Sequence, residues 1–179
     1  MTQTAKNYAD ALYDLARDEA LAEEILPQIT GAAELLGENE AYVRLLSAPN
    51  IPKPERVAAL DQAFSGRVHT YVLSFLKLLC ERGHIRELPA CAGRFRGRYN
   101  EDHGILEATA VTAFPLRPEL REKLARRLGE LTGKQVDLRT RTDPTLLGGV
   151  RLEYDGNELD GTLRQRLDGI KKTLSETVL

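Results

Sequence analysis

The sequence predicts a mainly α-helical protein that ends in a small α/β unit. Up to about Asn100, apolar residues recur with the period of one face of a helix. From Ile105 onward they alternate with polar residues, as in half-buried strands. The turn-forming segment 100–104 lies between the two patterns. We therefore expect two domains, 1–104 and 105–179.

The first part predicts a series of short helices. The most apolar stretch, 67–82, carries apolar residues around too wide an arc to face a single neighbour, so we expect it at the centre of a bundle. Gly37 is expected to cap the helix before it, and Pro89 to interrupt or kink the last helix. The expected helices cover about residues 8–16, 25–36, 41–46, 52–64, 67–82 and 85–99.

The second part predicts three or four short strands and two helices. The first strand starts at Ile105 and is broken by Pro115, and an amphipathic helix over 118–131 is stopped by Gly133. A second strand contains Val136 and Leu138. Gly148 and Gly149 then open a strand with Val150, Leu152 and Tyr154 on one face, and a closing helix follows with one apolar stripe, Leu163, Leu167, Ile170 and Leu174.

The bulk composition is that of an ordinary globular protein. The chain has 179 residues, 42% hydrophobic and 29% charged, with a formal net charge of -2, so it has no general attraction for nucleic acid or anionic lipid. No apolar run approaches the roughly 20 residues needed to cross a bilayer. The acidic residues near the N-terminus suit neither a signal peptide nor a transit peptide. Cys80 and Cys91 fit no metal or redox motif, and we expect two buried thiols.

No motif of an enzyme is present in the sequence. The segment 129–134, GELTGK, is one residue short of a phosphate-binding loop and is better explained as a helix stop. The Gly148–Gly149 pair precedes a strand, where a nucleotide site would need a helix N-terminus. The carboxylates and histidines show no catalytic spacing. We expect no catalytic residue, cofactor or metal.

The segment 94–99, RFRGRY, has two interpretations. Interleaved basic and aromatic side chains are what a nucleic-acid surface uses. Alternatively, Phe95 and Tyr99 pack inward while the arginines are solvated or pair with acids such as Glu101 and Asp102, which the overall charge favours. Gly93 and Gly97, four residues apart, are expected to let two helices approach closely.

Three segments resemble one known family. They are YADALYDLA at 8–16, FLKLLCERG at 75–83, and the tail from Leu146, which contains GGVRLEYDGNELDGT. In this order and spacing they are similar to the delta subunit of F-type ATP synthases, called the oligomycin-sensitivity-conferring protein in mitochondria. The family commonly has Asp-Gly-Ser where this chain has Asp160-Gly161-Thr162, a change that keeps a capping hydroxyl. The resemblance covers nearly the whole chain.

The resemblance implies a six-helix N-terminal bundle that holds the N-terminal helix of an α subunit between its first and fifth helices. Apolar positions on those helices are the candidate contacts, and the pattern does not separate groove residues from core residues. The C-terminal part would bind the C-terminal ends of the b subunits. The candidates are Tyr8, Ala11, Leu12, Leu15, Val72, Leu76 and Leu79 for the α subunit, and Leu163, Leu167, Ile170 and Leu174 for the b subunits.

By this resemblance the chain would be a stator subunit of the proton-translocating synthase that resists the torque of the rotor. It would need no cofactor and no nucleic acid, and would be held at the cytoplasmic face of a bacterial inner membrane only through the complex. The alternative is a nucleic-acid-associated helical protein using Arg94–Arg98. A small metabolic enzyme is a third interpretation, supported only by the glycines.

Overall fold

The computed structural model describes residues 1–146, 148–154 and 157–161 of the chain. The chain divides into two compact units, residues 1–99 and 100–179. The sequence placed the boundary after Gly104, whereas the structural division falls at Tyr99, inside the last helix of the first unit.

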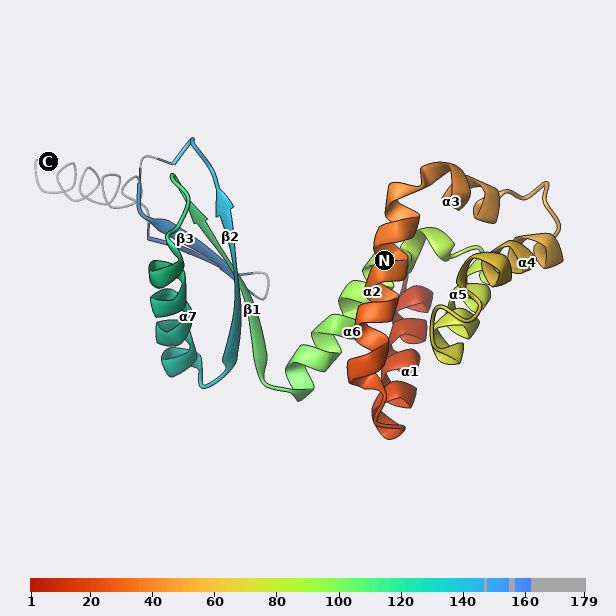
Figure 1. The fold of residues 1–179 in the computed structure, drawn as a ribbon, viewed down its shortest axis with the longest axis horizontal. Coiled ribbons are helices and arrows are strands. Elements are labelled where there is room, and N and C mark those ends of the chain that lie inside the picture. Colours follow the sequence, from red (N-terminus) through yellow and green to blue (C-terminus); the bar gives the residue numbers. More distant parts are fainter. Residues whose placement is uncertain (147, 155–156, 162–179) are drawn as a thin grey trace, which may run out of the picture. The chain divides into compact units, whose positions relative to one another are not determined.

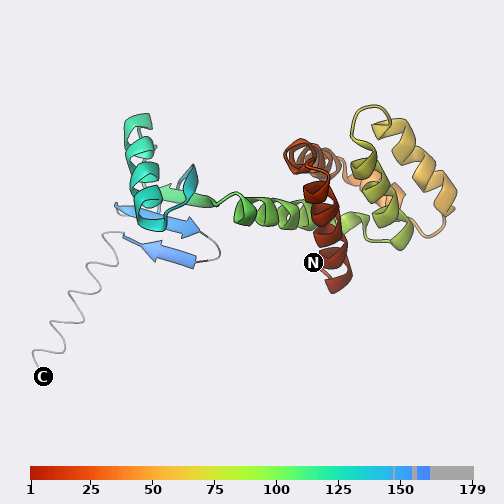
Figure 2. The same cartoon turned by 90° about the horizontal axis from the view of Figure 1, so that it is seen from below.

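The first unit contains six α-helices among the described residues, and Figures 1 and 2 show their course. The mainly helical class and the number of helices in this unit are thus confirmed. One continuous apolar core joins all six helices, and α5 contributes Val72, Phe75, Leu76, Leu79 and Cys80 to it. The helices are α1 (Gln3–Asp18), α2 (Ala22–Glu38), α3 (Glu40–Ser47), α4 (Lys53–Phe64), α5 (Thr70–Arg82) and α6 (Leu88–Asp102).

The end of α2 near Gly37 differs from the sequence prediction. Gly37 is not the cap, because Glu38 is the last residue of α2 and Asn39 is its C-cap. The Asn39 side chain instead accepts a hydrogen bond from the Tyr42 amide and starts α3. The last helical segment is interrupted near Pro89, which is one of the two predicted alternatives, rather than kinked. A 3₁₀ turn, Ile85–Glu87, precedes α6, and Pro89 lies in the first turn of α6, where a missing amide hydrogen costs nothing.

Among its described residues, the second unit is a four-stranded sheet with α7 on one face. The strand order is β2-β1-β3-β4; β1 and β2 are parallel, and the other neighbouring pairs are antiparallel. The helix α7 forms the crossover between the two parallel strands. The bounds are β1 (Ile105–Thr112), α7 (Pro118–Thr132), β2 (Gln135–Thr142), β3 (Val150–Tyr154) and β4 (Asn157–Asp160).

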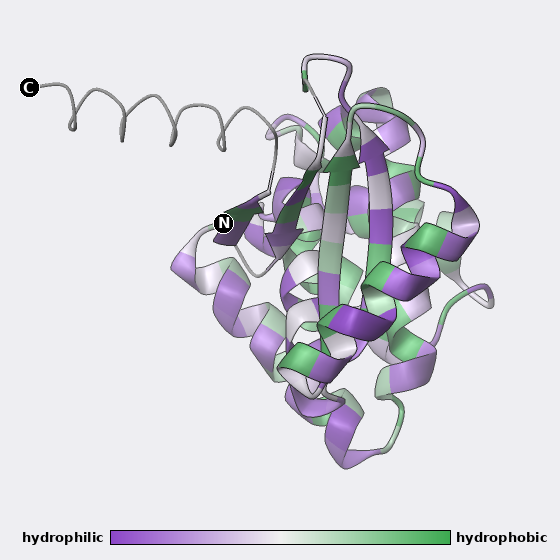
Figure 3. Cartoon of the chain, turned by 90° about the vertical axis from the view of Figure 1, so that its left-hand side faces the viewer, coloured by the Kyte–Doolittle hydropathy of each residue, from purple (hydrophilic) through white to green (hydrophobic). Residues whose placement is uncertain are grey.

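Residues on the two faces of this sheet differ in polarity, and hydrophilic and hydrophobic bands alternate along the strands (Figure 3). Ala108, Ala110, Leu138 and Leu152 form the buried cluster under α7. The predicted strands and the helix stop at Gly133, which has a φ of 68°, are confirmed. Gly148 and Gly149 have φ values of 134° and 88°, which fits the expected strand entry. The predicted closing helix lies outside the described residues.

Candidate partner-binding surfaces

The helix α1 carries apolar residues on two sides. Thr2 caps it by accepting a hydrogen bond from the Ala5 amide. Its inner face, which includes Leu12, is buried in the bundle. Beside this face lie Tyr8, which is half-buried, and Ala11 and Leu15, which are exposed. Leu15 is 42% exposed, so α1 presents a continuous apolar strip that the bundle itself does not cover.

The predicted α5 residues occupy a different environment. Val72, Leu76 and Leu79 each have no exposed surface and pack in the core. In contrast, Tyr71 and Leu78, seven residues apart on the same face of α5, are half-buried. The helices α1 and α5 pack against each other. The structure thus packs α1 against α5, with Leu12, Val72, Leu76 and Leu79 beneath the surface.

The predicted b-subunit residues, Leu163, Leu167, Ile170 and Leu174, lie outside the described residues.

The basic segment 94–99 packs into the bundle. Phe95 is fully buried, and Tyr99 is half-buried and lies against the core. The ring of Phe95 meets that of Tyr13 edge-to-face, with centroids 5.1 Å apart. Arg96 donates a hydrogen bond to the Thr30 hydroxyl of α2. This packing matches the structural interpretation of the segment, and the Phe95 ring is inaccessible to a base.

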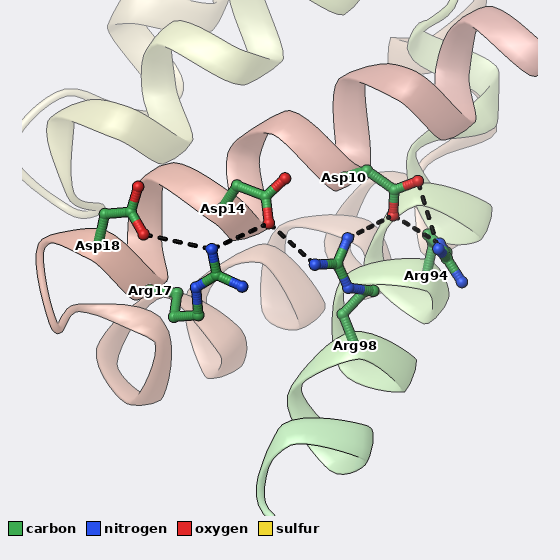
Figure 4. A network of polar contacts seen from close by, with 6 residues as sticks. All are labelled: Asp10, Asp14, Arg17, Asp18, Arg94 and Arg98. Atoms are coloured by element: carbon green, nitrogen blue, oxygen red, sulfur yellow. Dashed lines mark hydrogen bonds and ion pairs between the residues drawn. The ribbon is translucent and has the colours of Figure 1, made fainter.

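Arg94 and Arg98 pair with aspartates of α1, as Figure 4 shows. Arg94 contacts both carboxylate oxygens of Asp10, at 2.6 and 3.3 Å. Arg98 bridges Asp10 and Asp14 at 3.4 and 2.9 Å. Its guanidinium carbon also lies 4.9 Å from the centre of the Tyr13 ring. We call the four charged residues Asp10, Asp14, Arg94 and Arg98 the α1–α6 clasp.

The clasp changes the titration of Asp10. Partial burial would raise the pKa of this carboxyl, but the hydrogen bonds and charges of Arg94 and Arg98 outweigh burial and hold its pKa below the ordinary 3.8. A carboxyl whose pKa is lower in the folded state stabilises the fold above its unfolded-state pKa. That stabilisation is lost as the pH falls through the lowered value.

Asp10→Asn is therefore expected to lower the free energy of unfolding at pH 7 by on the order of 1 kcal/mol, because the pairs are partly exposed. The difference from the unsubstituted chain should shrink below about pH 4 and vanish once the folded carboxyl is protonated. Urea unfolding followed by circular dichroism from about pH 7 to about pH 2.5 measures this. Asp18→Asn is the control, since the Asp18 side chain is 71% exposed and pairs with Arg17 on the surface. A pH-independent difference for Asp10→Asn would contradict the assignment.

Gly93 and Gly97 of α6 do not lie where another helix approaches closely. A Cβ placed on Gly93 or Gly97 would meet no atom within 4 Å apart from the local helix backbone. The expected close approach of two helices at these glycines is therefore wrong, since the space beside them is open.

Both cysteines are free and buried, as predicted. Burial raises the pKa of Cys91 to about 11, which keeps the thiol protonated and unreactive. Within residues 1–146, 148–154 and 157–161, no group of His, Cys, Asp and Glu side chains has the arrangement of a metal site. The thiols therefore act as small apolar core residues.

The sequence did not indicate two surface features. An open depression of about 520 Å³ lies between α4 and α5, lined by Lys53, Pro54, Val57, Ala58, Asp61, Glu81 and Arg82. The sheet face opposite α7 carries ion pairs between strands, including Arg141 with Glu153 at 2.8 Å and Arg151 with Glu158 at 3.6 Å. The alternation of charged residues was visible in the sequence, but their pairing depends on the strand order β2-β1-β3-β4, which it does not give.

The chain has two compact units, and the first exposes apolar side chains of α1 beside a closed core, as protein-binding surfaces do. None of the helices in the described part is both long and apolar enough to span a bilayer. The model of the ATP synthase delta (OSCP) subunit family matches residues 4–174. The chain belongs to this family, and is accordingly a non-catalytic, peripheral-stalk subunit of an ATP synthase.

Individual relatives agree with this assignment. The chain is 28% identical over 169 residues to ATP synthase subunit delta of Clostridium kluyveri, covering 94% of this chain and 93% of the relative. It is 30% identical to the subunit delta of Geobacillus sp. strain WCH70, covering 95% and 96%. Its fold matches a chain of the Toxoplasma gondii mitochondrial ATP synthase hexamer with a TM-score of 0.75 at 17% identity, over 97% of this chain and 98% of that one.

Proposed function

We propose that this chain links the catalytic head of a proton-translocating F-type ATP synthase to the b subunits of its peripheral stalk. The family places it in partnership with the α subunits of the head and with the stalk. A rotor turning inside the head would carry the head round unless a stator held it against the membrane part. A stator protein bound at both ends transmits this reaction torque without performing chemistry.

The upper contact is the N-terminal helix of an α subunit, bound along α1 beside α5. The observation that carries this proposal is the exposed apolar strip of α1, Tyr8, Ala11 and Leu15, on a helix whose opposite side is closed in the core. Such a strip, with residues at helical spacing, fits the apolar face of an amphipathic helix. Leu12, Val72, Leu76 and Leu79 are buried in the core, and the half-buried Tyr71 and Leu78 are the candidate contacts on α5.

The lower contact is made by the C-terminal unit with the C-terminal ends of the b subunits. The stripe Leu163, Leu167, Ile170 and Leu174 is the candidate surface, because its apolar residues repeat at helical spacing. The complex then holds this protein at the cytoplasmic face of a bacterial inner membrane through its protein partners.

Leu15→Asp tests the upper contact. We expect calorimetric titration of the full chain with a peptide of the α subunit's N-terminal helix to give saturable binding. The introduced carboxylate would have to be desolvated in the apolar contact, so the substitution should weaken binding about tenfold or more. Leu45→Asp on α3 is the matched control, since Leu45 is 39% exposed and Leu15 is 42% exposed. Equal binding by both variants, with unchanged helix content, would remove α1 from the contact.

A further inference from the structure

The described residues of its own unit leave α7 partly uncovered. None of its residues is buried, although Leu124, Ala125 and Leu128 contact the apolar cluster of the sheet. Leu120 and Leu131 are exposed, the latter to 72%. One helix therefore covers only part of the apolar face of this sheet.

The position of Gly129 shows which part α7 covers. A Cβ on Gly129 would lie 3.2 Å from the Lys134 carbonyl oxygen and 3.9 Å from Cγ2 of Val136, at the start of the edge strand β2. This flank of α7 thus faces β2. At about 100° per residue, Leu120 and Leu131 lie on the opposite flank, which faces the half of the sheet formed by β3 and β4.

The β3–β4 half of the same face carries apolar residues. Leu152 pairs in register with Ala110, which belongs to the cluster under α7, so both point to the α7 side. Leu159 pairs in register with Leu152 and is 58% exposed on that side. Tyr154, two residues from Leu152, is half-buried. Leu120, Leu131, Tyr154 and Leu159 form what we call the open shelf.

The segment of the chain that follows β4 begins next to the open shelf. The strand β4 is antiparallel to β3, which is antiparallel to β1, so β4 runs parallel to β1. The chain therefore leaves β4 at the end of the sheet where it leaves β1 to enter α7. The Gly161 amide donates a hydrogen bond to the Val150 carbonyl, at 3.0 Å, and fixes this exit.

The sequence beyond this exit matches the shelf in length and polarity. In residues 162–174 the apolar positions Leu163, Leu167, Ile170 and Leu174 would span about 17 Å as a helix at about 1.5 Å per residue. That is close to the span of a strand of five residues such as β3, at about 3.3 Å per residue. A helix lying there would run alongside α7 in the same direction.

We propose that, in the free chain, residues 162–174 dock on the open shelf beside α7 and close the apolar face of the sheet over β3 and β4. This docking needs no partner and does not depend on the proposed stalk contact. If the b subunits use the same four apolar residues, they must displace the segment from the shelf, so intramolecular docking and stalk binding compete.

Hydrogen exchange on the full chain, read by mass spectrometry, tests the docking. We expect amides of 163–174 to exchange about tenfold or more slowly than an unstructured peptide of that sequence. Leu159→Glu and, separately, Leu131→Glu should abolish this protection, because each places a charge in the contact at a position that is already exposed. Leu35→Glu on α2 is the matched control, since Leu35 is 60% exposed and lies in the other unit; it should leave the protection unchanged.

Three outcomes would overturn the proposal. The first is rapid exchange of 163–174 in the unsubstituted chain while β1 stays protected. The second is protection that appears only after a peptide from the C-terminal end of a b subunit is added. The third is protection that rises with protein concentration together with a dimeric mass, which would mean that a second copy occupies the shelf. Binding of the α-subunit peptide is measured at the other unit, so its failure is distinct from each of these outcomes.

Discussion

Leu76→Ala is expected to lower the free energy of unfolding of the first unit by about 2–5 kcal/mol. Leu76 has no exposed surface and lies in the middle of α5, the helix that contributes five buried residues to the bundle core. Truncation removes apolar contacts and leaves a cavity that rigid neighbouring helices fill only in part. Urea unfolding, followed through the exchange of α5 amides, measures the loss in this unit alone.

The same variant decides how α5 takes part in binding the α subunit. Under conditions where Leu76→Ala remains folded, the α-subunit peptide should bind with nearly unchanged affinity, because the side chain does not reach the surface. Leu15→Ala is the complementary control, and should change stability by no more than about 0.5 kcal/mol because Leu15 is largely exposed. If the Leu76→Ala protein is stably folded but no longer binds the α-subunit peptide, then Leu76 contacts the partner directly.

Phe95→Ala is expected to have a comparable or larger effect, about 3–5 kcal/mol on the first unit. Phe95 is fully buried and makes an edge-to-face contact with Tyr13, which is also fully buried. Arg98 lies over the Tyr13 ring, so the substitution also loosens the aromatic support under the clasp. Thermal unfolding monitored by far-ultraviolet circular dichroism, at fixed protein concentration, checks the prediction.

Leu35→Ala provides a control for the Phe95 variant, since it shortens an exposed side chain of a neighbouring helix and should be nearly neutral. The comparison also tests the nucleic-acid alternative. If Phe95 stacked on bases, Phe95→Ala would leave stability unchanged and abolish a salt-dependent shift of labelled RNA. That result would contradict the buried position of the ring.

Local sequence signals predicted most elements of the fold because each depends on near neighbours in the chain. The change of period near Ile105 separated the helical part from the strands, and Gly133 ended α7 through its left-handed backbone. Where more than one residue near a helix end could serve as its cap, the predicted end was less accurate. Gly37 has the right residue type for a cap, but Asn39, which follows α2, provides the polar side chain that starts α3.

The candidate surfaces were harder to predict, because they depend on which elements become neighbours. Helical periodicity placed Leu15 and Leu76 in similar apolar stripes, yet one is exposed and the other is buried. The partners of Arg94 and Arg98 were expected close by in sequence. They lie instead on α1, 84 residues away for the Arg94–Asp10 and Arg98–Asp14 pairs, since helix packing rather than spacing along the chain decides which charges meet.

The α1–α6 clasp gives the bundle a defined path for mechanical load. Only His103 and Gly104 separate α6 from β1, so a pull on the second unit enters the first unit through α6. Sliding of α6 past α1 would break the contacts of Arg94 and Arg98 with Asp10 and Asp14 together, and these contacts therefore resist shear. Because α1 is also the helix that presents the exposed apolar strip, the clasp is a direct route for force between α6 and the proposed contact with the α subunit.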